Sequence, residues 1–231
     1  MFIVEGNIGA GKSTLLKLIG QHIAGVNVAL EPLHNWHTKL YGQSLLTQFY
    51  EEPQRWAYTM ETLTMMCRVQ EHLKDQLHCD TPLIIERSIY SGHYCFALNS
   101  YENGFMTDLE WQLYLALFNY LIPGRCLSPQ GFIYIKVDPE IAFNRILKRK
   151  RPGEQHITLE YLQQIAARHE QFLIDKATIL PDLLDVPILI LDGNQEFERD
   201  QKRLYDHVHD IKLFIKSHYY APHMAPYRLH V

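Results

Sequence analysis

The sequence predicts an α/β fold in which five parallel strands form a sheet that helices cover on both faces. Short apolar runs alternate along the chain with longer segments of helical periodicity, which is typical of parallel sheets. Residues 6–13 also match the pattern G-x-x-x-x-G-K-[ST] between an apolar run and a helical segment, as a phosphate-binding loop does. No internal repeat or low-complexity linker divides the 231 residues, so one domain spanning 1–231 is expected.

The first strand is expected at residues 2–4, and a helix is expected to begin at residue 15. In the loop between them, glycines let backbone N–H groups face a polyphosphate, Lys12 reaches the outer phosphates and the Ser13 hydroxyl can ligate magnesium. A glycine-rich turn that binds nothing is the weaker interpretation, because Lys12 and Ser13 are both present. The predicted nucleotide-binding residues of this loop are Gly6, Asn7, Ile8, Gly9, Ala10, Gly11, Lys12, Ser13 and Thr14.

Two further strands end in acidic residues. The run at 26–30 stops at Glu31, and the run at 82–85 stops at Glu86, which Arg87 follows. In parallel sheets the ligand crevice lies outside the carboxyl ends of the strands, so these side chains are expected near the loop. A solvated loop glutamate is the alternative for Glu31. Two carboxylates and a guanidinium beside a phosphate-binding loop favour phosphoryl transfer.

The remaining segments alternate as the fold requires. Residues 38–78 are expected to be helical with a break at 51–53, because a proline suits the first turn of a new helix. The segment 108–118 is apolar around much of its circumference, which fits a subunit interface or a central core helix equally well. The last two strands are expected at 131–137 and 187–191, and further helices at 158–177 and from 198 to about 217.

A dense basic run covers residues 145–154 and ends at a proline and a glycine. Such runs are usually solvated helix ends and sometimes nucleic-acid patches. Beside a phosphate-binding loop, a mobile lid at about 145–157 that closes over a triphosphate is the sharper interpretation. With this lid, the predicted architecture is that of a P-loop kinase.

Composition excludes several other classes. The net charge of −4 provides no global positive field for nucleic acid, and no apolar run is long enough to span a membrane. The four cysteines form no C-x-x-C pair and the histidines are scattered, which argues against a zinc ribbon or a disulfide framework. A cytoplasmic compartment is expected, or a mitochondrial one if a presequence was removed before residue 1.

Taken together, the motifs resemble the deoxynucleoside kinase family across nearly the whole chain. Their order and spacing make the resemblance specific. It implies transfer of the γ-phosphoryl group of ATP, with Mg²⁺, to the 5′-hydroxyl of a deoxynucleoside, and it implies a homodimer. The resemblance depends on residues 5–14, Glu31 with Trp36, Tyr50 with 55–56, 86–88 with 90–91, 145–154, 159–162 and 191–194.

The same resemblance implies a role for individual residues. Glu31 resembles the base that holds the 5′-hydroxyl, Arg87 its orienting partner, and Glu86 with Ser13 the magnesium ligands. The residues that would hold phosphates are Lys12, Arg145, Arg149 and Arg151, and those that would contact the donor base include Glu196 and Phe197. The residues that would bind the nucleoside are Tyr50 and Glu154 at the sugar 3′-hydroxyl, and Trp36 and Phe96 at the base.

Two positions depart from the family pattern in the base pocket. Glu61 stands where a glutamine usually reads the base edge, and Gly92 stands where deoxycytidine and deoxyguanosine kinases have an aspartate. Arg68 still matches an arginine near the base. An ionised glutamate only accepts hydrogen bonds, so it favours guanine, which offers two adjacent donors that Arg68 complements. The hypothesis is a purine, deoxyguanosine-leaning preference; cytosine remains open, and so does thymidine if Glu61 is protonated or turned away.

Two other functions stay open at this stage. A nucleoside monophosphate kinase such as thymidylate kinase shares the loop and a basic lid, but Glu31 and the turn at 86–88 favour a nucleoside acceptor. A structural subunit without activity is expected to lose the loop lysine or the acidic base. Because Lys12, Glu31 and Arg87 are all present, an active enzyme is favoured.

Overall fold

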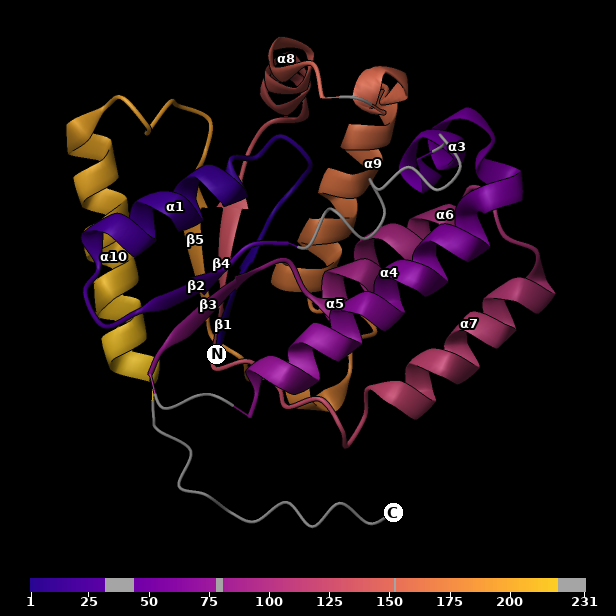
Figure 1. Cartoon of the computed structure of the whole chain (residues 1–231), viewed down its shortest axis with the longest axis horizontal. Coiled ribbons are helices and arrows are strands. Elements are labelled where there is room, and N and C mark those ends of the chain that lie inside the picture. The colour runs from indigo at the N-terminus through magenta and orange to yellow at the C-terminus, as the bar shows by residue number, and fades with distance from the viewer. Residues whose placement is uncertain (32–43, 78–80, 152, 220–231) are drawn as a thin grey trace.

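The computed structural model describes residues 1–31, 44–77, 81–151 and 153–219, and it confirms the α/β fold with a five-stranded parallel sheet. The strands lie in the order β2-β3-β1-β4-β5, and every neighbouring pair is parallel. Figure 1 shows the sheet at the centre of the molecule, between helices. The strands are β1 (Phe2–Glu5), β2 (Asn27–Ala29), β3 (Leu83–Glu86), β4 (Gly131–Lys136) and β5 (Ile188–Asp192).

Strand β1 is the centre of the sheet and is buried along its whole length. Phe2 and Val4 face one apolar cluster, whereas Ile3 faces another, because successive side chains of a strand point to opposite faces. Helices α1 (Lys12–His22), α8 (Pro139–Arg149) and α10 (Gln201–His218) contribute to the first cluster. Helices cover both faces, as predicted.

The second cluster is built largely from α4 (Pro53–Asp75), α7 (Asp108–Leu121) and residues 89–106. Helix α3 (Leu45–Glu51) ends immediately before α4, so the predicted break at the proline is present. Residues 38–43 of the predicted helical segment lie outside the described residues, and residue 44 is not helical. Strand β2 is shorter than the predicted 26–30, because Leu30 at this sheet edge is exposed.

One helical segment escaped prediction. Residues 89–102 form α5 (Ile89–Ser91), a π-helix (Gly92–Ala97) and α6 (Leu98–Glu102) without interruption. Nearly all residues from 89 to 100 are buried, so the segment lacks the polar face that makes a helix recognisable from its periodicity. This segment follows β3 in the chain, and the two are connected by the turn at Arg87 and Ser88.

Two boundaries differ from the prediction for local reasons. Helix α9 (Leu159–His169) continues as a π-helix (Glu170–Ile174) and ends before the predicted residue 177, where Lys176 has a left-handed φ of 50°. The basic run lies partly in α8, which ends at Arg149 because Lys150 has a φ of 48°. Among the described residues, no helix combines the length and the apolar character needed to cross a membrane.

Candidate active site

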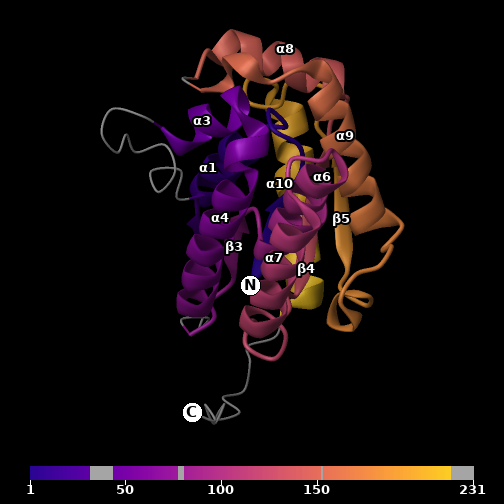
Figure 2. The same cartoon turned by 90° about the vertical axis from the view of Figure 1, so that its right-hand side faces the viewer.

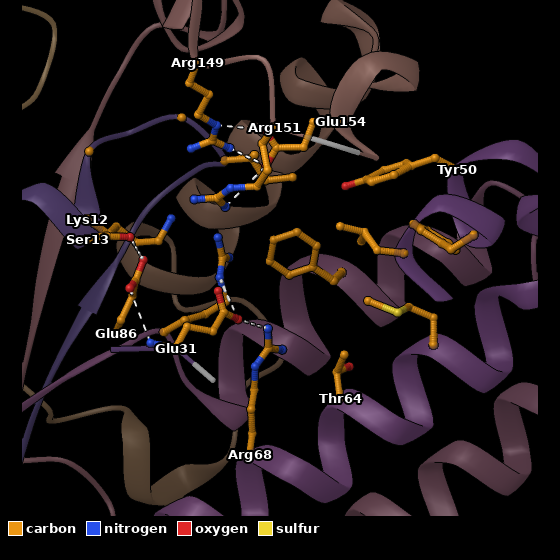
Figure 3. Close-up of a pocket in the computed structure, with 18 of the residues that line it drawn as sticks. Lys12, Ser13, Glu31, Tyr50, Thr64, Arg68, Glu86, Arg149, Arg151 and Glu154 are labelled. Carbon is orange, nitrogen blue, oxygen red and sulfur yellow. Dashed lines mark hydrogen bonds and ion pairs between the residues drawn. The ribbon is translucent and has the colours of Figure 1, made fainter. Parts of the chain in front are cut away.

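A cavity of about 310 Å³ opens beside the carboxyl ends of β1, β2 and β3, between α1, α4 and the basic segment after α8. Figure 3 shows side chains from all of these elements pointing into it. Most of the residues predicted for the site line this one cavity. They are Ile8, Gly9, Gly11, Lys12, Ser13, Thr14, Glu31, Tyr50, Glu61, Arg68, Glu86, Arg87, Phe96, Arg149, Arg151 and Glu154.

The phosphate-binding loop requires its glycines. Gly6 and Gly9 have φ values of 146° and 81°, and a Cβ on either would lie 2.6 Å from a backbone carbonyl oxygen, of Ile135 or of Ala142. The loop leads into α1, whose N-terminus favours negative charge. The Lys12 ammonium donates to the carbonyl oxygens of Gly6 and Asn7 at 3.0 and 2.8 Å. Burial, followed by the nearby charge of Arg87, lowers the pKa of Lys12 to about 7.

The side chains of Ser13 and Glu86 contact each other at the N-terminus of α1. The Ser13 hydroxyl donates to Glu86 Oε1 at 2.7 Å, and the Glu31 backbone N–H approaches Glu86 Oε2 at 3.4 Å (Figure 3). A hydroxyl and a carboxylate are hard oxygen ligands of the kind that Mg²⁺ uses together with water and substrate phosphates. Within the described parts of the chain, no group of three or more His, Cys, Asp or Glu side chains is arranged to hold a metal. The oxygen atoms of Ser13 and Glu86 could hold a magnesium ion whose remaining ligands come from water and phosphate.

Glu31 is held by two arginines. Its Oε1 lies 2.5 Å from Arg68 Nη2 and 3.6 Å from Arg87 Nε. Burial by itself would raise the pKa of Glu31, but the guanidinium groups of Arg68 and Arg87 outweigh it and hold the pKa below its usual value. The carboxylate is thus ionised at neutral pH and keeps acceptor capacity for a hydroxyl group.

Gly92 lies beside the guanidinium of Arg68 in its contact with Glu31. A Cβ on Gly92 would lie 2.7 Å from Arg68 Nη1, so the glycine makes room for the guanidinium. Gly92 itself does not line the cavity. The sequence predicted that Arg68 lies near the nucleobase. In the structure Arg68 contacts Glu31, the residue predicted to take the proton of the 5′-hydroxyl, which is 37 residues away along the chain.

The deep end of the cavity is formed by α4 and by Phe96. Glu61 is buried, and its Oε1 accepts a hydrogen bond from the Ser100 hydroxyl at 3.3 Å. Burial is the largest effect on Glu61 and raises its pKa to about 7. The Arg87 guanidinium lies 4.5 Å from the centroid of the Phe96 ring. The lining of the cavity therefore includes an apolar ring, Phe96, and a buried carboxyl group, Glu61, whose pKa lies near neutral.

In the basic segment at the cavity, Arg149 and Arg151 both contact the carboxylate of Glu154. Arg149 donates from Nε and Nη2 to the two oxygens of Glu154 at 2.7 and 2.5 Å, and Arg151 Nη1 lies 3.5 Å from Glu154 Oε1 (Figure 3). Burial and then the charge of Glu154 raise the pKa of the nearby Tyr50 phenol. The two arginines and the Tyr50–Glu154 pair predicted for the site thus face the same space.

Several predicted residues lie elsewhere. Arg145 Nη2 donates to the carbonyl oxygens of Asn194 and Gln195 at 3.3 and 3.5 Å, outside the cavity lining. The Phe197 ring packs against the loop at Gly11, whereas the Glu196 carboxylate accepts hydrogen bonds from backbone N–H groups just after it. Trp36 lies outside the described residues. Gly6, Asn7 and Ala10 shape the loop without lining the cavity.

Some lining residues were not predicted. Leu46, Phe49, Thr64 and Tyr161 also face the cavity. A signal for Thr64 was present in the sequence, because residues 60, 64 and 68 follow the i, i+4 spacing of one helix face, and Met60 and Arg68 both line the cavity from α4. Tyr161 lies on α9, far along the chain from Tyr50. The centroids of the two rings are 6.1 Å apart, so Tyr161 reaches the site through tertiary packing.

The chain is similar in sequence to proteins of one known family. The family model described as deoxynucleoside kinase matches residues 2–216. The chain is 34% identical to deoxycytidine kinase 2 of Gallus gallus, covering 93% of this chain and 89% of that one. It is 33% identical to the mitochondrial deoxyguanosine kinase of Xenopus laevis (85% and 82% covered) and 32% identical to a probable deoxycytidine kinase of Fowlpox virus strain NVSL (94% and 88%).

Proposed function

This chain belongs to the deoxynucleoside kinase family, and we propose that it transfers the γ-phosphoryl group of ATP to the 5′-hydroxyl of a deoxynucleoside. Enzymes of this family are phosphotransferases that use a nucleoside triphosphate donor. The observation that carries the proposal is that the ionised Glu31, Arg87 and the loop lysine Lys12 line one cavity. A base for the acceptor hydroxyl and a cation for the donor phosphates therefore face each other.

The proposed mechanism assigns each side chain a separate task. Glu31 accepts the hydrogen bond of the 5′-hydroxyl and then takes its proton, while Arg87 keeps the carboxylate in place at 3.6 Å. Lys12 binds outer phosphate oxygens. We propose that the chain is a single kinase domain and that residues 145–157 form its lid. In this lid, Arg149 and Arg151 pair with Glu154, and they exchange part of this pairing for contacts with phosphate oxygens. Glu154 and Tyr50 are then placed to bind the sugar 3′-hydroxyl.

We assign the magnesium ion to Ser13 and Glu86, whose oxygen atoms are already 2.7 Å apart. When bound, magnesium neutralises charge on the phosphate oxygens of the donor. Arg145, Glu196 and Phe197 lie behind the loop, where they are suited to the donor side of the site rather than to the acceptor.

The test is a panel of the four deoxynucleosides and their monophosphates, each assayed with ATP and magnesium. We expect 5′-phosphorylation of at least one deoxynucleoside and no turnover of the monophosphates. Consumption of a monophosphate alone would identify a nucleoside monophosphate kinase. No turnover by a folded protein that binds ATP would favour a structural homologue.

For base selection, we propose a purine preference that leans toward deoxyguanosine. The ionised Glu61 is a double acceptor in a buried pocket, and guanine presents N1–H and the N2 amino group on one edge. Thymine offers one N–H between two carbonyls, so an ionised carboxylate would leave one acceptor unpaired, at about 1–3 kcal/mol. The arginine at position 68 is less available to guanine than the sequence suggested, because it already contacts Glu31.

This preference should depend on pH. Because the pKa of Glu61 is about 7, the carboxyl is largely protonated at pH 6 and largely ionised at pH 8. A protonated carboxyl donates one hydrogen bond and suits thymine, whereas the ionised form suits guanine. We expect the ratio of kcat/KM for deoxyguanosine to that for thymidine to rise about tenfold from pH 6 to pH 8.

Glu61→Gln is the matched variant for this measurement, since glutamine keeps the shape and does not titrate. The ratio should then be independent of pH and shifted toward pyrimidines. Taking a ratio of two substrates removes pH effects on Lys12 and Glu31, which act on both. A ratio that rises equally in the variant, or thymidine as the best substrate at pH 8, would show that Glu61 does not select the base.

We propose that the protein acts as a homodimer through α4 and α7. Figures 1 and 2 show these helices side by side on the outside of the molecule, and the two helices are in contact. Large apolar side chains are exposed on both helices, and several exposed together are typical of a surface that binds another protein. They are Leu63, Met66, Leu109, Leu113 and Tyr120. A second copy of the same face would cover them.

The double change of Leu109 and Leu113 to lysine is expected to halve the molar mass measured by light scattering after size exclusion. Charged side chains in an apolar interface lack partners, and association becomes unfavourable. Leu213→Lys is the control, because Leu213 is an equally exposed leucine on α10. A monomeric wild-type protein, or dissociation of the control as well, would contradict the proposed interface.

We further propose a reducing compartment, the cytoplasm or the mitochondrial matrix. Cys95 and Cys126 carry free thiols, and burial raises the pKa of both, which keeps these thiols protonated and unreactive.

A further inference from the structure

Arg87 has an unusual backbone conformation for a residue with a long side chain. Its φ is 64°, in the left-handed region that side chains other than glycine rarely adopt. The strain lies in the turn that connects β3 to α5, directly at the arginine that contacts Glu31. Such a conformation persists only where the surroundings hold it, and residues that hold it contribute to the geometry of the site.

The end of β1 provides the contacts that hold this turn. The backbone N–H of Arg87 donates to the carbonyl oxygen of Val4 at 2.9 Å. The next residue, Ser88, accepts hydrogen bonds from the N–H groups of Tyr90 and Ser91, so its hydroxyl oxygen caps α5. Its single proton is then donated to Glu5 Oε1 at 2.5 Å. Both sides of Arg87 are therefore tied to successive residues of one strand.

Glu5 is an unexpected residue for its place. It is the last residue of β1, it is completely buried, and it does not line the active-site cavity. Burial is the largest effect on its carboxyl and raises the pKa, while the charge of Arg87 opposes this. Among the described residues, Glu5 Oε2 has no hydrogen-bond partner. An apolar side chain would fill such a position at lower cost, so stability alone does not explain the carboxyl group.

We propose that Glu5 is a positioning residue for the phosphoryl transfer. By accepting a hydrogen bond from the Ser88 hydroxyl, Glu5 holds Arg87 in its left-handed conformation. That conformation directs the guanidinium to Glu31 at 3.6 Å and over the ring of Phe96 at 4.5 Å. The inference extends the proposed kinase function and depends on it for its kinetic test. In this proposal Glu5 acts through Ser88 and Arg87, and it does not itself line the active-site cavity.

Two substitutions separate the acceptor role from the charge. Glu5→Leu removes both the charge and the hydrogen-bond acceptor of Ser88, and we expect kcat to fall at least about tenfold. The charge of Glu5 also acts on Lys12, but Glu5→Leu and Glu5→Gln both remove it, so the comparison of these two variants isolates the hydrogen-bond acceptor. Glu5→Gln keeps a carbonyl oxygen for Ser88, and we expect it to restore most of kcat. Should Glu5→Leu fail to fold, Glu5→Asp replaces it, since the shorter side chain withdraws the acceptor from Ser88. Equal losses for Gln and for Leu, or for Gln and for Asp, would overturn the proposal.

A double-mutant cycle with Arg87→Lys tests whether the effect passes through the arginine. In the Arg87→Lys background the Glu5 change should cost less than about twofold in kcat, since the group that Glu5 positions is gone. Losses that multiply would show that Glu5 does not act through Arg87. Ile215→Ala, a buried change on α10, is the control for general destabilisation, which should lower Tm without lowering kcat of the folded enzyme.

A crystal structure of the same Glu5 variant gives a readout that needs no activity. We expect φ of Arg87 to leave the left-handed region and its guanidinium to move away from Glu31. An unchanged φ near 64° would overturn the inference even in an active enzyme. If instead the wild-type protein phosphorylates no deoxynucleoside, the proposed function fails, and the structural result still decides the positioning role.

Discussion

Replacing Glu31 with glutamine is expected to lower kcat by a factor of about 10²–10⁴, the usual contribution of a general base. Glutamine keeps the size and one oxygen of the side chain but cannot take a proton. KM for ATP should change by less than about twofold, because Glu31 faces the acceptor side and the phosphate-binding loop is unaltered. Steady-state kinetics with the best deoxynucleoside of the panel measure both quantities.

Glu71→Gln is the matched control for this variant. Glu71 is an acidic residue of α4, one turn from Arg68, and it lies outside the active-site cavity. Its replacement should leave kcat within about twofold, as surface changes usually do. Near-normal turnover in Glu31→Gln would remove Glu31 from the role of base.

The ionised state of Glu31 also predicts a pH profile. Because Arg68 and Arg87 hold the pKa of this carboxyl below its usual value, the inflection that Glu31 contributes to the acid limb of kcat/KM should lie below the ordinary range of a glutamate and well below the titration of Glu61. Removing a positive charge beside a carboxylate raises its pKa, so Arg68→Met should move this limb to higher pH. Limbs that coincide in both proteins would show that the Arg68–Glu31 contact does not persist in the working enzyme.

Replacing Lys12 with methionine is expected to lower kcat/KM by at least about 10³, because the ammonium both binds the donor phosphates and neutralises charge in the transition state. Methionine fills the same space without a charge. Lys212→Met, an exposed lysine on α10, is the control and should leave kcat/KM unchanged. Retained activity in Lys12→Met would contradict the role of the whole loop.

Lys12 further predicts that ATP binding takes up protons. Its pKa of about 7 means that much of it is neutral at pH 8, and the negative triphosphate raises that pKa and restores the ammonium. The uptake should therefore grow from pH 6 to pH 8. Calorimetry in buffers of different ionisation enthalpy measures it, and the difference between wild type and Lys12→Met isolates the lysine. Equal uptake in both proteins would assign the proton to another group.

The correct and the incorrect expectations have identifiable causes. The helix at 53–75 begins at a proline, and the helix at 108–121 is preceded by a Thr-x-x-Glu capping box, so local sequence contains a signal for the start of each. The helix at 89–102 has no polar face to reveal its period, because it is packed on nearly all sides. Periodicity reports one-sided burial and is silent where a segment is enclosed.

The amino-acid sequence alone was sufficient to locate the phosphate-binding loop and to predict that Glu31, Glu86 and Arg87 come together with it. Parallel strands bring their carboxyl ends to one edge of the sheet, so a residue just after each strand has a known destination. Contacts across the fold were not accessible in this way. Arg68 contacts Glu31 with its guanidinium beside Gly92, and Glu61 has a pKa near 7 because other elements bury it. Glu5 joins the site through Ser88, 83 residues later in the chain. Side-chain partners and desolvation are properties of the packed structure, and only the tertiary fold sets them.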